Sequence, residues 1–345
     1  MDMSINAYEP PVRALFFICL MGMLGLPLAN LLVARPSLSS ALRTRVDGQL
    51  LKLQRYAGLG LAVASLGLFA AQLAPLGLDL TLADEWRAIF ESALFGQIAV
   101  LRVGLALLYV FVLGIVKHER VRVALLLALA LIGAATVTRT SHSYAMEAGV
   151  PALLADFIHV LSGALWAGGL VVLVLCGDAL GEHADAIEPM RRLITRFSPV
   201  AMAAVALVCG SGMLLTSVHV LEPGTLRSTD YGSLLIFKVA LVAVALVFAA
   251  MHRFVTLRTM RYAVNLQRFK HSLWIETLIV LGVFYAAAML SAAAMPGIPH
   301  EGPVGGPSRF AGLTFRSWLD LGVLAVAVAS LLAFALTARK RTTFT

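Results

Sequence analysis

Residues 152–176 have the sequence ALLADFIHVLSGALWAGGLVVLVLC. The stretch is apolar almost throughout, and its one charged side chain is Asp156. A helix that spans the hydrocarbon core of a bilayer needs about 20 apolar residues, because each residue adds only about 1.5 Å. The stretch therefore predicts a transmembrane helix. Similar long apolar runs, separated by short polar segments, recur along the whole chain.

The composition also indicates a membrane protein. Of 345 residues, 60% are hydrophobic and only 13% are charged, whereas soluble domains average about 25% charged residues. The mean hydropathy is +0.88. The net charge of +8 does not indicate a nucleic-acid partner, because most basic residues lie between apolar runs and form no stripe with aromatic residues. The sequence thus predicts an all-α, polytopic helix bundle in a lipid bilayer.

The apolar runs predict nine membrane helices and one short surface helix. Residues 82–94 alternate apolar and charged side chains in a way that is typical of an amphipathic helix on the outer membrane surface. The predicted transmembrane helices are residues 12–34, 53–74, 95–116, 121–138, 152–176, 198–220, 233–251, 273–295 and 317–337.

The distribution of basic residues predicts the orientation of the bundle. Most of the 27 Lys and Arg residues fall in the segments after the first, third, fifth and seventh helices and in the C-terminal tail. The alternate segments are poor in Lys and Arg. Because cytoplasmic loops carry the excess of Lys and Arg, we expect the N-terminus outside and the C-terminus inside.

Charged side chains within the apolar runs need a specific reason, because each costs about 2.5–3.5 kcal/mol at the membrane centre. Arg102, Asp156 and Lys238 are predicted at a similar depth in the outer leaflet. We expect Asp156 to pair with at least one of the two cations, since an unpaired buried charge is strongly disfavoured. Glu276 lies near the inner end of its helix, and Trp166 shares a helix face with Asp156. Together these five residues form a predicted intramembrane charge network.

Three histidines are predicted at the outer ends of three helices, namely His142, His159 and His219. Imidazole is a common ligand of copper, zinc and nickel, so the three side chains predict a metal site. Further candidate ligands are Met146, Met213 and Asp156.

Other histidines carry no such expectation. His118, His183 and His271 lie in inner, charge-rich segments, and His252 ends a helix on the same side. The plain expectation for these four is a solvated surface position. His300 lies in an outer loop and is a weak candidate ligand.

The run Asp156-Phe-Ile-His-Val-Leu-Ser-Gly-Ala-Leu-Trp-Ala-Gly-Gly-Leu170 resembles the signature D-x-x-H-x-x-x-x-x-x-W-x-G-G-L of the CopD family of copper-resistance membrane proteins. Four further features are similar to that family. They are Arg196-Phe-Ser198 before Gly210-Ser-Gly212, Asp230-Tyr-Gly-Ser-Leu-Leu-Ile-Phe-Lys238, Glu276 at the start of the next helix, and Thr140-Ser-His142 before the signature.

The resemblance implies copper handling at the bacterial inner membrane, alongside a separate periplasmic copper carrier, CopC. It implies that the metal at the histidines is copper and that the chain is a copper permease rather than an enzyme. It also suggests a division into an N-terminal four-helix region (1–139), a CopD-like four-helix core (140–296), and an outer loop with an additional helix (297–345). Helix 317–337 is extra to the eight helices of that family.

Two other functions remain open at this stage. The chain could bind b-type haem through His159 and His219, although haem relays through both leaflets usually need two histidines on one helix. It could also be a scaffold or sensor that transports nothing. An enzyme is not expected, because the sequence contains no nucleophile–base pair, phosphate loop or two-metal carboxylate cluster.

Overall fold

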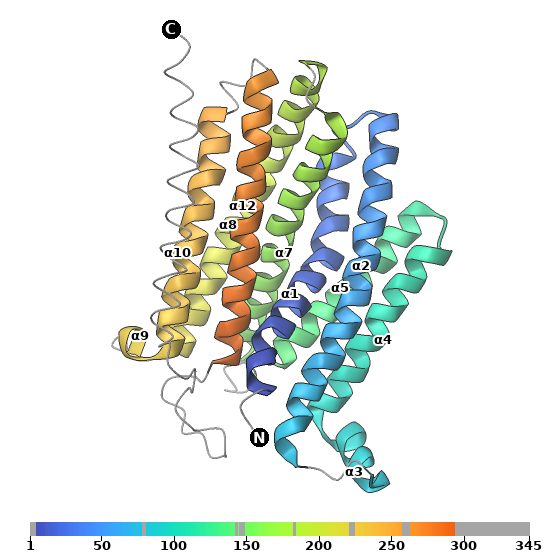
Figure 1. The fold of residues 1–345 in the computed structure, drawn as a ribbon, viewed down its shortest axis with the longest axis vertical. Helices are drawn as coiled ribbons and strands as arrows, with labels where there is room; N and C mark the ends of the chain where they lie inside the picture. Colours follow the sequence, from blue (N-terminus) through green and yellow to red (C-terminus); the bar gives the residue numbers. More distant parts are fainter. Residues whose placement is uncertain are drawn as a thin grey trace. The chain divides into compact units, whose positions relative to one another are not determined.

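The computed structural model describes residues 5–77, 81–141, 144, 149–181, 184–220, 225–256 and 263–293. Within these ranges the chain is helical, without β-strands (Figure 1). Eight of the described helices are long and apolar enough to cross a membrane, and they overlap the first eight predicted helices. The prediction of an all-α polytopic bundle is confirmed, and the orientation stays a prediction. The ninth predicted helix, 317–337, lies outside the described residues.

The chain packs as two units, Met1–Val218 and His219–Thr345, and each is described by itself. The last residue of α8 is also the first of the second unit. The first unit contains α1 (Ile5–Ala29), η1 (Asn30–Ala34), α2 (Ser40–Leu73), η2 (Ala74–Leu76), α3 (Ala83–Arg87), η3 (Ala88–Ser92), α4 (Leu94–Ile115), α5 (Glu119–Arg139), α7 (Gly149–Leu180), η4 (Ala184–Ala186) and α8 (Ile187–His219). The second contains α9 (Thr225–Ser228), α10 (Asp230–Met251), η5 (His252–Thr256) and α12 (Ala263–Ala292).

Several helices extend well beyond their apolar runs. Helix α2 begins at Ser40 and α8 at Ile187, each more than two turns before the predicted start. A helix makes its backbone hydrogen bonds internally, so it can continue from lipid into water. The apolar run therefore predicts the membrane-spanning part of a helix and not its ends.

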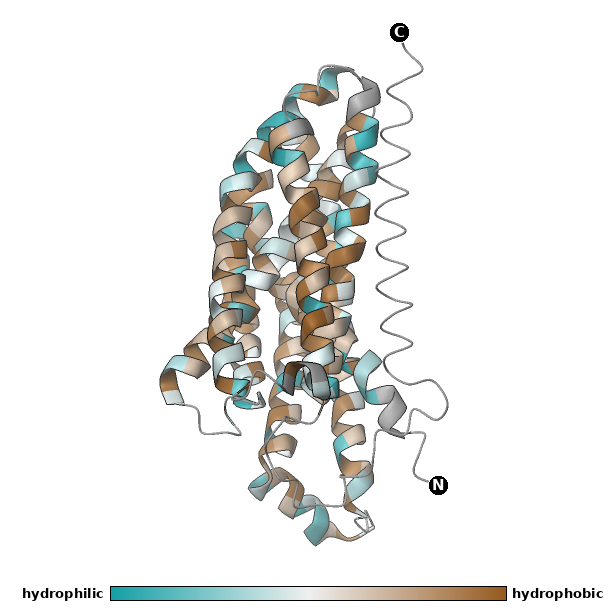
Figure 2. Cartoon of the chain, turned by 90° about the vertical axis from the view of Figure 1, so that its left-hand side faces the viewer, coloured by the Kyte–Doolittle hydropathy of each residue, from teal (hydrophilic) through white to brown (hydrophobic). Residues whose placement is uncertain are grey.

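The surface of the bundle suits lipid. Large apolar side chains such as Val63, Phe111 and Val247 are 65%, 59% and 68% exposed. Hydrophobic residues dominate the middle of the long helices, and hydrophilic residues are more frequent toward their ends (Figure 2). Exposed apolar area on this scale is stable in a bilayer and would cause aggregation in water.

Helix α1 lies at the centre of the first unit, where it packs against α2, α5 and α7. Two glycines make the α1–α7 crossing very close. A Cβ at Gly168 of α7 would lie 2.6 Å from Cα of Gly25 in α1, and a Cβ at Gly25 would overlap the backbone oxygen of Ala164. The two backbones are therefore in direct contact, as small residues permit between membrane helices.

A proline inside α1 creates a polar group that another helix satisfies. Pro27 lies within α1 and has no N–H, so it cannot bond the carbonyl of Met23 four residues earlier. The hydroxyl of Tyr109 in α4 donates to that carbonyl at 2.9 Å, and Tyr109 is fully buried. Because a bilayer offers no water to a free carbonyl, this bond explains why a tyrosine is tolerated in an apolar core.

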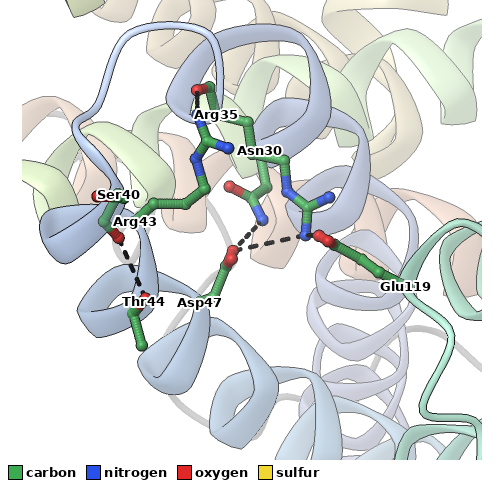
Figure 3. Close-up of polar contacts among 7 residues, drawn as sticks. All are labelled: Asn30, Arg35, Ser40, Arg43, Thr44, Asp47 and Glu119. Carbon is green, nitrogen blue, oxygen red and sulfur yellow. Dashed lines mark hydrogen bonds and ion pairs between the residues drawn. The ribbon is translucent and has the colours of Figure 1, made fainter.

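The end of α1 is a π-helix, η1, that carries a polar cluster (Figure 3). Arg35 directly after it forms ion pairs with Asp47 of α2, at 3.7 Å, and with Glu119 of α5. The side-chain amide of Asn30 donates to Asp47 at 2.7 Å. The cluster therefore ties the ends of three helices together through one guanidinium.

The second unit is built on α10 and α12, which pack against each other. Helix α10 begins with a capped turn, in which the side chain of Thr229 accepts a hydrogen bond from the Gly232 backbone at 3.1 Å. A Cβ at Gly232 would lie 2.6 Å from the carbonyl carbon of Leu226 in α9. Glycine is needed here because α9 turns directly onto the start of α10.

Candidate functional site

Arg102 is held by neutral groups at the end of α5 and in the residue directly after it. It is 9% exposed on α4, and its guanidinium donates to the hydroxyl and carbonyl oxygens of Thr136 at 2.9 and 3.0 Å and to the hydroxyl of Thr140 at 2.8 Å. It also stacks over the ring of Phe16, 4.6 Å from the ring centre. These contacts satisfy several of its donors without a carboxylate.

His159 lies at the contact between α7 and α8, within the first unit. Its Nδ1 atom is 3.1 Å from the carbonyl oxygen of Val208 and 3.1 Å from Oγ of Ser211. A Cβ at Gly212 would lie 3.3 Å from Cε1 of His159, so the glycine makes room for the ring. The sequence Gly210-Ser-Gly212 thus meets the histidine of the α7 motif directly.

The surroundings of His159 decide where its ring hydrogen lies. The carbonyl of Val208 can only accept a hydrogen bond. The hydroxyl of Ser211 donates to the Leu207 carbonyl at 2.5 Å, which leaves its oxygen lone pairs for the ring. Both neighbours therefore call for a hydrogen on Nδ1, and the neutral ring then carries its lone pair on Nε2.

The rest of the α7 motif packs against its neighbours. Trp166 is buried, with 3% of its surface exposed. A Cβ at Gly169 would lie 2.8 Å from Cζ of Phe197 in α8, so each of the adjacent glycines, Gly168 and Gly169, accommodates a different helix. Asp156 is partly exposed in the first unit and Lys238 partly exposed in the second. An ion pair of Asp156 stays a prediction.

His219 belongs to the second unit and is 8% exposed. Its Nδ1 atom lies 3.4 Å from the hydroxyl of Tyr231, which is also buried. Tyr231 and Gly232 form the Tyr-Gly pair that precedes Lys238 in the sequence motif. Tyr231 thus contacts the candidate ligand His219, while Gly232 leaves room for the backbone of α9.

The structure does not test the predicted three-histidine metal site. His142, Met146 and His300 lie outside the described residues, and His159 and His219 belong to different units. Met213 is described and is 74% exposed, which is typical of a lipid-facing side chain. Among the described residues, no three His, Cys, Asp or Glu side chains gather closely enough to hold a metal ion.

One polar cluster was not expected. His252 was predicted to be a solvated surface group, and this prediction is wrong, because only 5% of it is exposed. Its Nδ1 atom lies 2.9 Å from Oε2 of Glu276, and its Nε2 atom lies 2.8 Å from Oγ of Ser272. Glu276 and Ser272 are four residues apart on one face of α12, and that spacing was available from the sequence. His271, in contrast, is exposed as predicted.

Residues 191–290 match the family model "Copper resistance protein D", and residues 7–153 match "Copper resistance protein D-like, N-terminal domain". The chain belongs to the CopD family. Its family is one of copper-resistance membrane proteins and not of enzymes.

A curated relative agrees with this assignment. The chain is 30% identical over 167 residues to "Copper transport protein CutJ" of Bacillus subtilis (strain 168). The match covers 48% of this chain and 29% of the length of CutJ. No solved structure matches. This CopD-family chain is therefore a multi-pass membrane protein of a copper-handling family.

Proposed function

We propose that this chain is a copper permease of the bacterial inner membrane, which takes copper at the periplasmic face and passes it inward. A separate CopC-like carrier would deliver the metal. The family membership supports copper as the cargo, and the name of the relative CutJ supports transport. The bundle itself offers eight spans within its described part.

The observation that carries the proposal is the fixed ring of His159. A histidine that binds a metal usually donates its other ring hydrogen to a carbonyl or carboxylate, which fixes the tautomer and orients the ring. The Val208 carbonyl and Ser211 hydroxyl hold Nδ1 in this way. Nε2 is then the copper-binding atom, since neutral imidazole is a good copper ligand.

The remaining proposed ligands are His142 and His219, with Met146 and Asp156 as additional candidates. Three imidazoles suit Cu(II), whereas an added thioether favours Cu(I). The 74% exposure of Met213 argues against including it, so we leave it out of the proposed site. Trp166, Arg102 and Lys238 are assigned to the surrounding network and not to the metal.

The test compares His142→Ala and His159→Ala with His118→Ala as a matched control, since His118 is exposed at the start of α5. The measurements are bound copper per purified protein and copper uptake into proteoliposomes. We expect the first two variants to lose copper binding and uptake while eluting as folded protein in detergent. The control should behave like the wild type.

Three results would overturn the proposal. The first is a His142→Ala, His159→Ala double variant that binds copper at the wild-type stoichiometry. The second is a Soret band in the absorption spectrum of the purified wild type, lost in His159→Ala, which would favour haem instead. A wild type that binds copper but takes none into liposomes would favour a scaffold or sensor.

A further inference from the structure

The buried cluster at the end of α10 has no role in the copper site proposed above. His252 is the first residue of the π-helix η5 and lies two residues before the end of the span Asp230–Phe254. Glu276 and Ser272 face it from α12 and are 1% and 7% exposed. The rings of Phe248 and Phe269 contact the imidazole edge-on, with centroids 6.5 and 4.9 Å away. An ionisable pair is thus enclosed by apolar side chains.

The contacts form a chain of three groups that can each hold a proton. Oε2 of Glu276 lies 2.9 Å from Nδ1 of His252, although the geometry does not satisfy a directed hydrogen bond to that oxygen. On the other side of the ring, Nε2 lies 2.8 Å from the hydroxyl of Ser272. Both ring nitrogens are therefore engaged, one by a carboxylate and one by a group that either donates or accepts.

Packing alone does not explain this pair. Burial of a carboxylate and an imidazole is costly, and a well-packed apolar pair of similar size is often as stable or more so. Ionisable groups inside membrane segments are usually functional for this reason. A π-helical turn, which begins at His252, is also frequent at functional positions.

A metal ion fits the cluster poorly. The cluster contains one imidazole and one carboxylate, and the described residues offer no third His, Cys, Asp or Glu ligand there. In the described parts of η5 and α12, the other charged or titratable groups at this end are Arg253, Arg268, Lys270 and His271. Arg253 and His271 are exposed, and the other two are partly exposed. The ion pair of Glu276 in the described part of the chain is made with His252.

We propose that His252 and Glu276 form a proton-binding site, and that its proton is exchanged as copper crosses the membrane. In the loaded state both ring nitrogens carry hydrogen, with Nδ1–H beside the carboxylate and Nε2–H donating to Ser272. Loss of the proton from Nε2 to water leaves a neutral ring, and the Ser272 hydroxyl then rotates to donate to Nε2. The carboxylate stabilises the loaded state, because it lies next to the positive ring. The coupling to copper rests on the proposed permease function.

The first experiment needs no copper. Purified protein carrying ¹⁵N-labelled histidine is titrated in detergent, and the His252 signal is assigned by its loss in His252→Gln. We expect this signal to respond to pH in the wild type and to respond differently in Glu276→Gln, since the isosteric amide removes the negative charge that faces Nδ1 at 2.9 Å. His271→Gln, which changes an exposed ring on α12, should leave the His252 titration unchanged. A His252 signal that does not titrate, or that titrates identically in Glu276→Gln, overturns the proton site.

The second experiment tests coupling in proteoliposomes that contain a pH-sensitive dye. Copper uptake by the wild type and by His271→Gln should move protons, whereas Glu276→Gln and His252→Gln should show at least a tenfold lower ratio of protons to copper. An unchanged ratio in both variants overturns the coupling. If the wild type takes up no copper, the permease function and the coupling fail together, and the histidine titration still decides the proton site.

Discussion

Gly168→Ala should destabilise the protein strongly, because the new methyl group would meet backbone atoms of α1. A Cβ at this position would lie 2.6 Å from Cα of Gly25, and ordinary contacts begin near 3.4 Å. The two helices must therefore separate by about 1 Å, and a gap of that size forfeits about a quarter to a half of each dispersion contact across the interface. Backbone atoms cannot rotate away as a side chain can. We therefore expect the free energy of unfolding to fall by about 3 kcal/mol, the upper end of the range for an overpacked core.

Gly163→Ala is the matched control on the same helix. A Cβ at Gly163 would meet nothing within 4 Å, and alanine favours a helix over glycine by up to about 1 kcal/mol. Equilibrium unfolding in mixed detergent micelles measures both variants. We expect Gly168→Ala to lower the ratio of folded to unfolded protein about 100-fold and Gly163→Ala to leave it equal or higher. If Gly168→Ala is as stable as Gly163→Ala, the direct backbone contact between α1 and α7 does not exist.

Two further predictions concern orientation and the buried arginine. Reporters fused after Arg341 should be active only as cytoplasmic reporters, such as a fluorescent protein, and an active alkaline-phosphatase fusion there would contradict the predicted orientation. Thr136→Val should cost about 1–3 kcal/mol of unfolding free energy, because it leaves a buried donor of Arg102 without its hydroxyl acceptor. Thr277→Val, which removes a buried hydroxyl that donates to the Leu273 carbonyl of its own helix, should cost less, and equal losses in the same unfolding assay would speak against a special role for Thr136.

The membrane-spanning part of the fold follows from the sequence because it depends on one local quantity, the length of each apolar run. A run of about 20 apolar residues must cross the bilayer as a helix, whatever its neighbours are. The amphipathic pattern of residues 82–94 is local as well, and the structure has helical turns there, in α3 and η3. The stacked rings of Trp86 and Phe90 lie on its apolar side.

The polar contacts were harder to predict because they depend on how separate helices meet. The pairing of Asp156 with Arg102 or Lys238 stays a prediction, whereas the hydroxyls of Thr136 and Thr140 that bond Arg102 gave no signal in the sequence. His252 was assigned to the surface because basic residues follow it. Only the packing of α10 on α12 reveals that its ring faces Glu276.

Spacing on one helix was the part of the site that could be predicted. Asp156, His159 and Trp166 recur at helical intervals, and the family signature places the histidine among them. Which ring nitrogen of His159 is held, and by which groups, could not be known before α8 was seen to bring Val208 and Ser211 against it.

The ion pairs of Arg35 have a consequence for how the protein is made. The chain is synthesised from its N-terminus, so Arg35 leaves the ribosome before Asp47 and long before Glu119. While α1 is being inserted, the guanidinium is a bare cation that retains its end of the helix in the cytoplasm, if the predicted orientation holds. Once α2 and α5 have followed, the same charge is taken up by their carboxylates. In that orientation, one side chain contributes to the topology of the chain during insertion and joins α2 and α5 in the folded protein.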